Sequence, residues 1–234
     1  MNMKKNILII GGSSGIGLEL IKLIGGENNV FAACRTNEHL TGLNVTHIPF
    51  DVLTDTLDLS VLPESLDGFV YCPGSINLRP FKGLKPETFL NDFSINVMGA
   101  VKTLQSVLSK LQSGNVTASV VFYSTVAVQT GMAYHASVAA AKGALEGLAR
   151  SLAAELAPKV RVNVIAPSIT DTPLADKFLN NDTKKENAAG RHPLQRFGSA
   201  EEMAEATAFL LSNKSSWMTA QVLHIDGGIG DIKS

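Results

Sequence analysis

The chain has 234 residues, of which 45% are hydrophobic and 18% carry a charged side chain. These proportions predict one compact globular domain and exclude an intrinsically disordered chain. The formal net charge of −1 offers no excess charge for binding nucleic acid or an anionic membrane. The apolar runs are shorter than a membrane span or a signal-peptide core. The two cysteines lack CxxC spacing and the five histidines lack metal-ligand spacing, so we expect reduced thiols, no metal and a cytoplasmic location.

A short apolar run meets a cluster of glycines near the start of the chain. Residues 6–10 predict a buried strand, and the sequence Gly-Gly-Ser-Ser-Gly-Ile-Gly follows at once. A helical pattern begins directly after it, so the strand, the turn and the helix N-terminus together predict an anion-binding site. A tight turn in any α/β protein is the alternative interpretation. The residues that we expect to hold a pyrophosphate here are Gly11, Ser13, Ser14, Gly15, Ile16 and Gly17.

The second predicted strand, residues 30–34, ends at Arg35. Dinucleotide-binding folds usually place an acid here to bind the ribose 2′-hydroxyl, whereas an arginine suits a 2′-phosphate. No acid follows before Glu38, so the pattern favours NADP(H) over NAD(H). A solvated loop charge is the alternative role of Arg35. Only about ten residues lead to the next strand at 47–50, which is short for a parallel crossover, so we expect a vestigial helix between them.

Two further strands are predicted to end at the same edge of the sheet. Asp51 and Val52 follow the third strand, and Asp51 suits both a hydrogen bond to an adenine amino group and the cap of a short helix. A fourth strand at 68–72 runs into a second sharp turn. Ligands of open parallel sheets gather at such strand ends, and the residues expected there are Cys72, Pro73 and Gly74.

Two long helices flank the fifth predicted strand. The first runs from about residue 86 to 113, and Asn96 lies beside its apolar stripe, where a helix-contact or surface role is the alternative. The strand at 118–123 ends in Ser124 and Thr125. The second helix, at about 133–156, is rich in alanine, which predicts close contact with a sister subunit. Lys142 lies in the middle of this apolar helix, either buried with a partner or extending its ammonium to solvent.

The last third of the chain supplies the remaining elements. A sixth strand at 160–165 leads to Pro167 and Ser168, which we expect to bind the cofactor together with Thr170 and Thr172. Residues 169–198 hold Thr170, Thr172 and two short polar helical stretches, and a long segment at a strand end predicts a lid over a ligand. A helix at 200–211 and a strand at 221–225 follow. This alternation predicts an α/β fold with a doubly wound parallel sheet of about seven strands, helices on both faces, and a single domain over residues 1–234.

Over roughly residues 6–228 the chain resembles the short-chain dehydrogenase/reductase superfamily. The spacing Gly11-x-x-x-Gly15-x-Gly17 is similar to that family's cofactor turn. The resemblance implies a Rossmann fold, a nicotinamide cofactor, a homodimer or homotetramer, and a Lys142 that binds the nicotinamide ribose. Other matches fall in order along the chain, at Asp51, Asn96, Asn163, Pro167, Thr172 and Asp226-Gly-Gly228.

The family's chemistry uses Asn, Ser, Tyr and Lys, with Tyr four residues before Lys and Ser thirteen before Tyr. The resemblance implies that Val138 stands at the Tyr position and Thr125 at the Ser position, with Ser124 beside it. Valine has no proton to give, although a positioned acid contributes roughly 10²–10⁴ in rate. His135 lies seven residues before Lys142, which is the spacing of the catalytic Tyr in the enoyl-reductase branch, and its imidazole suits acid catalysis. An ordinary residue at a helix start is the alternative.

We therefore predict an NADP(H)-dependent oxidoreductase that transfers a hydride to or from a small carbonyl compound or an activated alkene. In this hypothesis Thr125, with Ser124 beside it, polarises the substrate and His135 replaces the missing acid. Asn96 would position a helix kink and a water near Lys142, as the resemblance implies. The alternative is a nucleotide-binding protein without turnover, which acts as a sensor or an assembly subunit.

Overall fold

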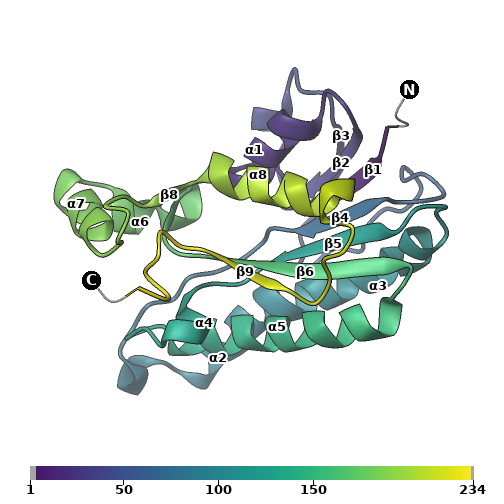
Figure 1. Cartoon of the computed structure of the whole chain (residues 1–234). Coiled ribbons are helices and arrows are strands. Elements are labelled where there is room, and N and C mark those ends of the chain that lie inside the picture. The colour runs from purple at the N-terminus through teal and green to yellow at the C-terminus, as the bar shows by residue number, and fades with distance from the viewer. Residues whose placement is uncertain (1–3, 233–234) are drawn as a thin grey trace.

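Seven parallel strands form the central sheet, and the computed structural model describes residues 4–232 (Figure 1). The order of the strands reverses between β1 and β4, and such a reversal opens a crevice at the carboxyl ends of the strands. The predicted doubly wound parallel sheet is therefore confirmed. Across the sheet the strands are β3 (Thr46–Pro49), β2 (Asn29–Cys34), β1 (Asn6–Ile10), β4 (Gly68–Tyr71), β5 (Ala118–Tyr123), β6 (Val160–Pro167) and β9 (Val222–Ile225).

Helices cover both faces of the sheet, which explains why the strands read as unbroken apolar runs. Along β1, Leu8 and Ile10 belong to one core cluster, whereas Ile7 and Ile9 belong to the other. Figure 1 shows α1 (Gly15–Ile24) and α8 (Ala200–Leu211) above the sheet. On the opposite face lie α2 (Pro86–Phe93), α3 (Gly99–Gln112), α4 (Ala127–Thr130) and α5 (Ala136–Leu156).

The long helix predicted over residues 86–113 is divided into α2 and α3 by a π-helical turn, η3 (Ser94–Met98). Asn96 lies in this turn and donates through Nδ2 to the backbone oxygen of Asp92 at 2.7 Å. The Tyr71 hydroxyl donates to the backbone oxygen of Ile95 at 2.5 Å. A Cβ on Gly99 would lie 2.2 Å from that hydroxyl, so only glycine lets the tyrosine enter the turn. Asn96 is fully buried, which excludes the surface role.

Two other local predictions are tested by the structure. A short 3₁₀ helix, η1 (Glu38–Leu40), is the vestigial helix expected between β2 and β3. No helix follows Asp51. Its Oδ1 instead accepts the amide of Leu53 at 2.9 Å and closes a turn, which excludes the alternative that Asp51 caps a short helix. An aspartate carboxylate can cap a helix or close a tight turn, and after Asp51 the chain forms the turn.

The alanines of α5 divide between two environments. Ala141, Ala149 and Ala153 are buried in the chain's own core against the sheet, so they are not available to a sister subunit. Ala140 and Ala144 are exposed on the other side of the helix. Self-association through that exposed side stays a prediction, which light scattering of the purified protein tests.

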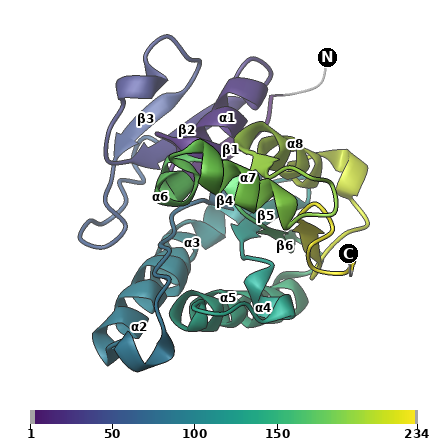
Figure 2. The same ribbon diagram turned by 90° about the vertical axis from the view of Figure 1, so that its left-hand side faces the viewer.

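Residues 169–198 leave the sheet after β6 and fold as a small separate layer. Two short strands, β7 (Thr170–Asp171) and β8 (Gly198–Ser199), pair at its base. Between them lie η4 (Pro173–Ala175), α6 (Asp176–Leu179) and α7 (Asp182–Gly190), around a small apolar cluster. Figure 2 shows α6 and α7 in front of the carboxyl ends of the strands. The two short helices are confirmed, and a lid function of this segment stays a prediction.

The short turns η2 (Phe81–Gly83) and η5 (Asn213–Ser215) lie in loops. Helix α8 begins where it was predicted because Ser199 and Glu202 form a capping box, in which each side chain accepts the other's backbone amide. Within residues 4–232 we find no helix with the length and apolar character that crossing a membrane requires.

Candidate active site

The glycine turn after β1 forms a cradle whose geometry requires glycine. Gly11 and Gly15 have φ of +83° and +53°, in the left-handed region that other residues rarely adopt. A Cβ on Gly17 would lie 2.3 Å from the backbone oxygen of Gly11. The turn faces a cavity of about 440 Å³ at the N-terminus of α1. Predicted residues that line it are Gly11, Ser13, Ser14, Gly15, Ile16, Gly17, Arg35, Asp51, Val52, Cys72, Pro73, Gly74 and Thr172.

The far end of this cavity carries the charged residues after β2 and β3. Arg35 is exposed, and among the hydrogen bonds of the described residues its side chain has none. Asp51 uses Oδ1 to close its turn, and its backbone amide donates to Asp55 Oδ2 at 2.7 Å. A guanidinium that is free of internal partners is available to an anion in the cavity.

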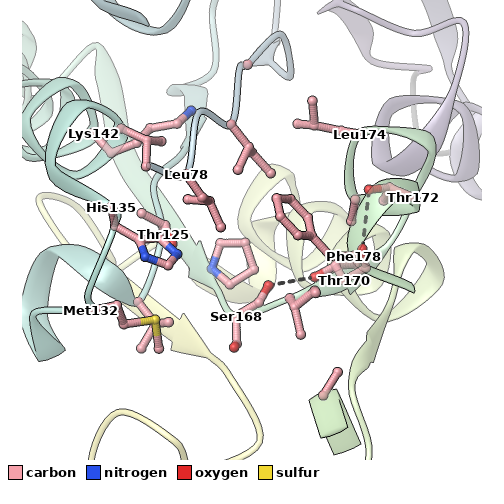
Figure 3. Close-up of a pocket in the computed structure, with 18 of the residues that line it drawn as sticks. Leu78, Thr125, Met132, His135, Lys142, Ser168, Thr170, Thr172, Leu174 and Phe178 are labelled. Atoms are coloured by element: carbon pink, nitrogen blue, oxygen red, sulfur yellow. Dashed lines mark hydrogen bonds between the residues drawn. The ribbon is translucent and has the colours of Figure 1, made fainter. Parts of the chain in front are cut away.

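A second cavity, of about 480 Å³, adjoins the first (Figure 3). The two cavities share the lining residues Ile16, Cys72, Gly74, Thr172 and Leu174, so one elongated ligand can extend from the glycine turn into the second cavity. The second cavity brings together the remaining predicted residues except Asn96, namely Ser124, Thr125, His135, Lys142, Pro167, Ser168 and Thr170.

Lys142 is buried at the base of the second cavity, which excludes the solvent-extended alternative. Its Nζ donates to the backbone oxygen of Tyr123 at 2.7 Å. Burial lowers the pKa of the ammonium from its ordinary value of 10.5 to about 8, and the nearby Cys72 and Asp92 side chains oppose that shift. The ammonium has three N–H donors, so further donors remain available to a ligand in the cavity.

Ser124 and Thr125 follow β5 and differ in what their hydroxyls contact. The Ser124 hydroxyl donates to Glu146 Oε1 on α5 at 2.6 Å. Thr125 Oγ1 instead accepts the backbone amide of Ala127 at 3.3 Å, which leaves its own proton free to donate. Thr125 therefore has the geometry to polarise a carbonyl in the cavity, whereas the Ser124 proton is already engaged with a carboxylate.

A buried polar network fixes the loop after β4 beside Lys142. Asn96 Nδ2 donates to Ser75 Oγ at 2.9 Å, and Ser75 Oγ donates to Asp92 Oδ1 at 2.5 Å. Asn77 Nδ2 donates to the same carboxylate oxygen at 2.7 Å. Asp92 Oδ2 is buried and is one of the few such atoms without a partner in the described residues. Sequence reasoning missed Asp92, although an acid beside the buried stripe of a helix was a visible signal.

Val138 and His135 lie at the start of α5, on the side that faces the cavity. Val138 is buried and lies one helical turn before Lys142, with no polar atom in its side chain. His135 is the residue before the helix, and its Nδ1 contacts the backbone oxygen of Ala133 at 2.7 Å. Since a carbonyl only accepts, this contact assigns the proton of the neutral ring to Nδ1 and leaves Nε2 free.

The remaining wall of the second cavity is mainly apolar. Leu78 comes from the loop after β4, Met132 from the segment before α5, and Leu174 and Phe178 from the layer of η4 and α6 (Figure 3). His192, after α7, also lines the cavity, and its ring contacts Ser168 Oγ. Sequence reasoning gave no role to His192, because a lone histidine in a polar loop carries no local signal.

Comparison with known proteins identifies the family. The chain matches the family model described as enoyl-(acyl carrier protein) reductase over residues 54–230. L-xylulose reductase from Bos taurus is 30% identical over 234 aligned residues, which cover 96% of this chain and 96% of that protein. The chain belongs to the short-chain dehydrogenase/reductase family. A tropinone reductase homolog from Arabidopsis thaliana is also 30% identical, over 96% of this chain and 91% of that protein.

Solved structures agree with this membership. A short-chain dehydrogenase family protein from Francisella tularensis is 27% identical and superposes with a TM-score of 0.87, over 97% of this chain and 99% of that one. A 4-hydroxyisoleucine dehydrogenase solved with NADH superposes with a TM-score of 0.88 at 23% identity, over 98% of this chain and 100% of that one. The second likeness supports the fold of this short-chain dehydrogenase/reductase and nothing finer.

Proposed function

We propose that this short-chain dehydrogenase/reductase is an NADP(H)-dependent oxidoreductase that transfers a hydride to or from a small, mainly apolar carbonyl compound or activated alkene. The observation that carries the proposal is the pair of adjoining cavities. One has a glycine cradle at a helix N-terminus, which suits a pyrophosphate. The other holds Lys142 and the free hydroxyl of Thr125, and five lining residues belong to both cavities.

The residues present fit a dinucleotide along its whole length. The turn of Gly11, Gly15 and Gly17 leaves backbone space for the pyrophosphate, and Asp51 lies at the adenosine end. Lys142 would bind the nicotinamide ribose hydroxyls. These hydroxyls would accept hydrogen bonds from the ammonium N–H groups that do not donate to the Tyr123 carbonyl. The nicotinamide would then supply or accept the hydride in the second cavity.

The preference for NADP(H) is proposed from Arg35 and from the lack of an acid directly after β2. Structural neighbours do not decide this point, because a 4-hydroxyisoleucine dehydrogenase was solved with NADH and an actinorhodin polyketide ketoreductase with NADPH. The apolar substrate class is proposed from the lining of the second cavity. Side chains such as Leu78, Met132 and Phe178 offer nothing to the hydroxyls of a sugar.

The chain's own residues would act on the oxygen of the substrate. Thr125 donates a hydrogen bond to that oxygen and favours the developing alkoxide, and the Lys142 ammonium adds positive charge nearby. Val138 would occupy the position of the family's tyrosine, so the proton must come from another group. His135 is the replacement that the sequence suggested, and it lines the cavity. In its imidazolium form its Nε2, which has no partner among the described residues, would carry the proton that the substrate oxygen takes up.

A panel of apolar aldehydes, ketones and conjugated enones tests this proposal, with the loss of NADPH absorbance as the readout. We expect saturable NADPH oxidation by the wild-type chain, and a His135→Ala variant that loses roughly tenfold or more in kcat while its NADPH affinity is kept. The exposed His39 gives a matched control, and His39→Ala should behave as wild type. Unchanged turnover in His135→Ala would remove His135 from the mechanism.

A binding protein without turnover is the second candidate, and the apolar side chain of Val138 beside Lys142 favours it. In that case the chain binds NADPH in calorimetry, yet no compound in the panel increases NADPH oxidation above background. Any saturable turnover excludes this candidate. A chain that binds neither NADPH nor NADH at millimolar concentration would contradict both proposals.

A further inference from the structure

A serine and a histidine form a hydrogen-bonded pair in the wall of the second cavity. Ser168 follows β6 directly, and His192 follows α7. His192 Nε2 lies 2.8 Å from Ser168 Oγ, and Nδ1 lies 2.7 Å from the backbone oxygen of Ala188. The carbonyl only accepts, so Nδ1 carries the proton of the neutral ring. Nε2 is then an acceptor, and the Ser168 hydroxyl donates to it.

The surroundings of His192 fix its ring in this orientation. The side chain is 2% exposed, and the ring packs against Gly227, where a Cβ would lie 3.3 Å from Cδ2. Gly227 has φ of +63°, so glycine suits both the backbone and the close approach. The ring therefore has a fixed tautomer, one acceptor nitrogen and one protein donor, which is the arrangement by which a histidine base is oriented toward a hydroxyl.

The pair lies at the same edge of the sheet as the residues proposed to bind the substrate oxygen. The backbone amide of Val126, next to Thr125, donates to the oxygen of Pro167 at 3.0 Å, so the segments after β5 and β6 run side by side. Ser168, His192, Thr125 and Lys142 all line the second cavity. A substrate oxygen that contacts Thr125 is thus bound in the cavity that Ser168 and His192 also line.

We propose that Ser168 and His192 are the acid–base pair of this site, with Ser168 in contact with the substrate oxygen and His192 acting through it. The inference rests on the proposed oxidoreductase function and deepens it, because it names, besides His135, a source of the proton that Val138 cannot provide. Ser168 is the catalytic residue of the pair, and His192 is its positioning and proton-storing partner.

The proton balance can be followed in the direction of alcohol oxidation. The substrate O–H bond breaks, its proton passes to Ser168 Oγ, and the Ser168 proton passes to His192 Nε2, which becomes an imidazolium. The substrate carbon loses its hydride to the oxidised nicotinamide dinucleotide, and the alcohol becomes a carbonyl. In reduction the same protons move back, and one proton is taken up from water by the pair when the cavity is open.

One measurement tests the hydrogen-bonded pair of Ser168 and His192 and does not require catalytic turnover. Long-range proton–nitrogen NMR spectra of chain labelled with ¹⁵N-histidine report the tautomer of each ring. We expect His192, assigned by its absence in His192→Gln, to carry its proton on Nδ1, and we expect its Nε2 resonance to move in Ser168→Ala. A neutral ring protonated on Nε2, or a Nε2 resonance unchanged in Ser168→Ala, would overturn the pair.

The catalytic role is tested by kcat, KM and NADPH affinity of three variants. Ser168→Ala removes the hydroxyl, Ser168→Thr retains it, and His192→Gln keeps an acceptor and a donor but cannot take up a proton. We expect Ser168→Ala and His192→Gln to lose roughly 10²-fold in kcat, with KM and NADPH affinity within about threefold of wild type. Ser168→Thr should recover most of the rate. The exposed Ser216 supplies the control, Ser216→Ala.

The outcomes separate this inference from the proposed function. A wild-type chain that binds no dinucleotide and oxidises no NADPH overturns the proposed function, and this inference with it. A wild-type chain that turns over, together with Ser168→Ala within threefold of its kcat, overturns the acid–base pair alone. A loss of thermal stability in His192→Gln without a loss of kcat assigns His192 a purely structural role and also overturns it.

Discussion

Burial of Lys142 predicts that this residue lowers the stability of the chain at neutral pH. Its pKa falls from 10.5 to about 8 on folding. Each unit corresponds to about 1.4 kcal/mol, so the buried ammonium costs about 3 kcal/mol below pH 8. Between pH 8 and 10.5 the unfolded chain binds more protons than the folded one, so stability rises with pH across this window and the penalty fades.

Replacing Lys142 by methionine removes the charge and keeps an apolar side chain of similar length. The variant leaves the Tyr123 carbonyl without its donor, which costs about 1–2 kcal/mol. The net expectation at pH 7 is a gain of about 1–2 kcal/mol, or about 2–8 °C in Tm for a chain of this size. The same variant should bind NADPH more weakly, because the ribose hydroxyls lose their donor.

Calorimetric unfolding at pH 7 and at pH 10.5 measures this gain directly. We expect Lys142→Met to unfold at a higher temperature than wild type at pH 7, and the difference to vanish or reverse at pH 10.5. Lys102→Met is the matched control, because Lys102 is exposed on α3 and should show no such gain. A variant that is less stable than wild type at pH 7, or equally stabilised at both pH values, would refute the reasoning.

Two further substitutions test the first cavity. Gly17→Ala places a Cβ 2.3 Å from the Gly11 carbonyl and should cost about 2–3 kcal/mol and abolish NADPH binding, whereas Gly26→Ala, with nothing within 4 Å, should change Tm little. Equal Tm values for the two variants would contradict the cradle geometry. Arg35→Ala should weaken NADPH binding about tenfold and leave NADH binding unchanged in calorimetric titrations, and an equal effect on both cofactors would remove Arg35 from the 2′-phosphate site.

The fold was predictable because its signals are local. The apolar run of β1, the glycine spacing and the start of α8 at a capping box each lie within a few residues of sequence. Parallel strands that are buried on both faces produce runs of apolar residues, and these runs stand out from the polar residues on either side. The same reasoning placed the strand ends at one edge, and the two cavities are lined by the residues named there.

The interrupted helix shows where local patterns fail. The apolar stripe continues through residues 86–113, so the helical spacing of its apolar residues alone predicts one unbroken helix. Within the π turn the Ile95 oxygen accepts the Tyr71 hydroxyl, which comes from a strand more than twenty residues away. The family resemblance implied a helix kink at Asn96, and Gly99 was a local sign of the contact, because a glycine within a helix often marks a close approach.

The contacts that give the site its chemistry are likewise long-range. The Ser124 hydroxyl is engaged by Glu146, and the Ser168 hydroxyl by His192, over separations of 22 and 24 residues. Sequence spacing identified the serines as residues at strand ends. It could not tell which hydroxyl keeps a free proton and which one has a base beside it, because those partners come from other elements.

The buried charge of Lys142 bears on ligand binding, whereas the acid–base groups of this site bear on turnover. Lys142 has a single hydrogen-bond acceptor within the described residues. A buried ammonium with unused donors is unfavourable, so Lys142 supports a cavity that holds a polar ligand rather than a tight turn of no consequence. A binding protein without turnover would need Lys142 as much as an enzyme would. His135 and the pair of Ser168 and His192 are groups that binding alone does not require, and their variants therefore bear on whether this chain is a catalyst.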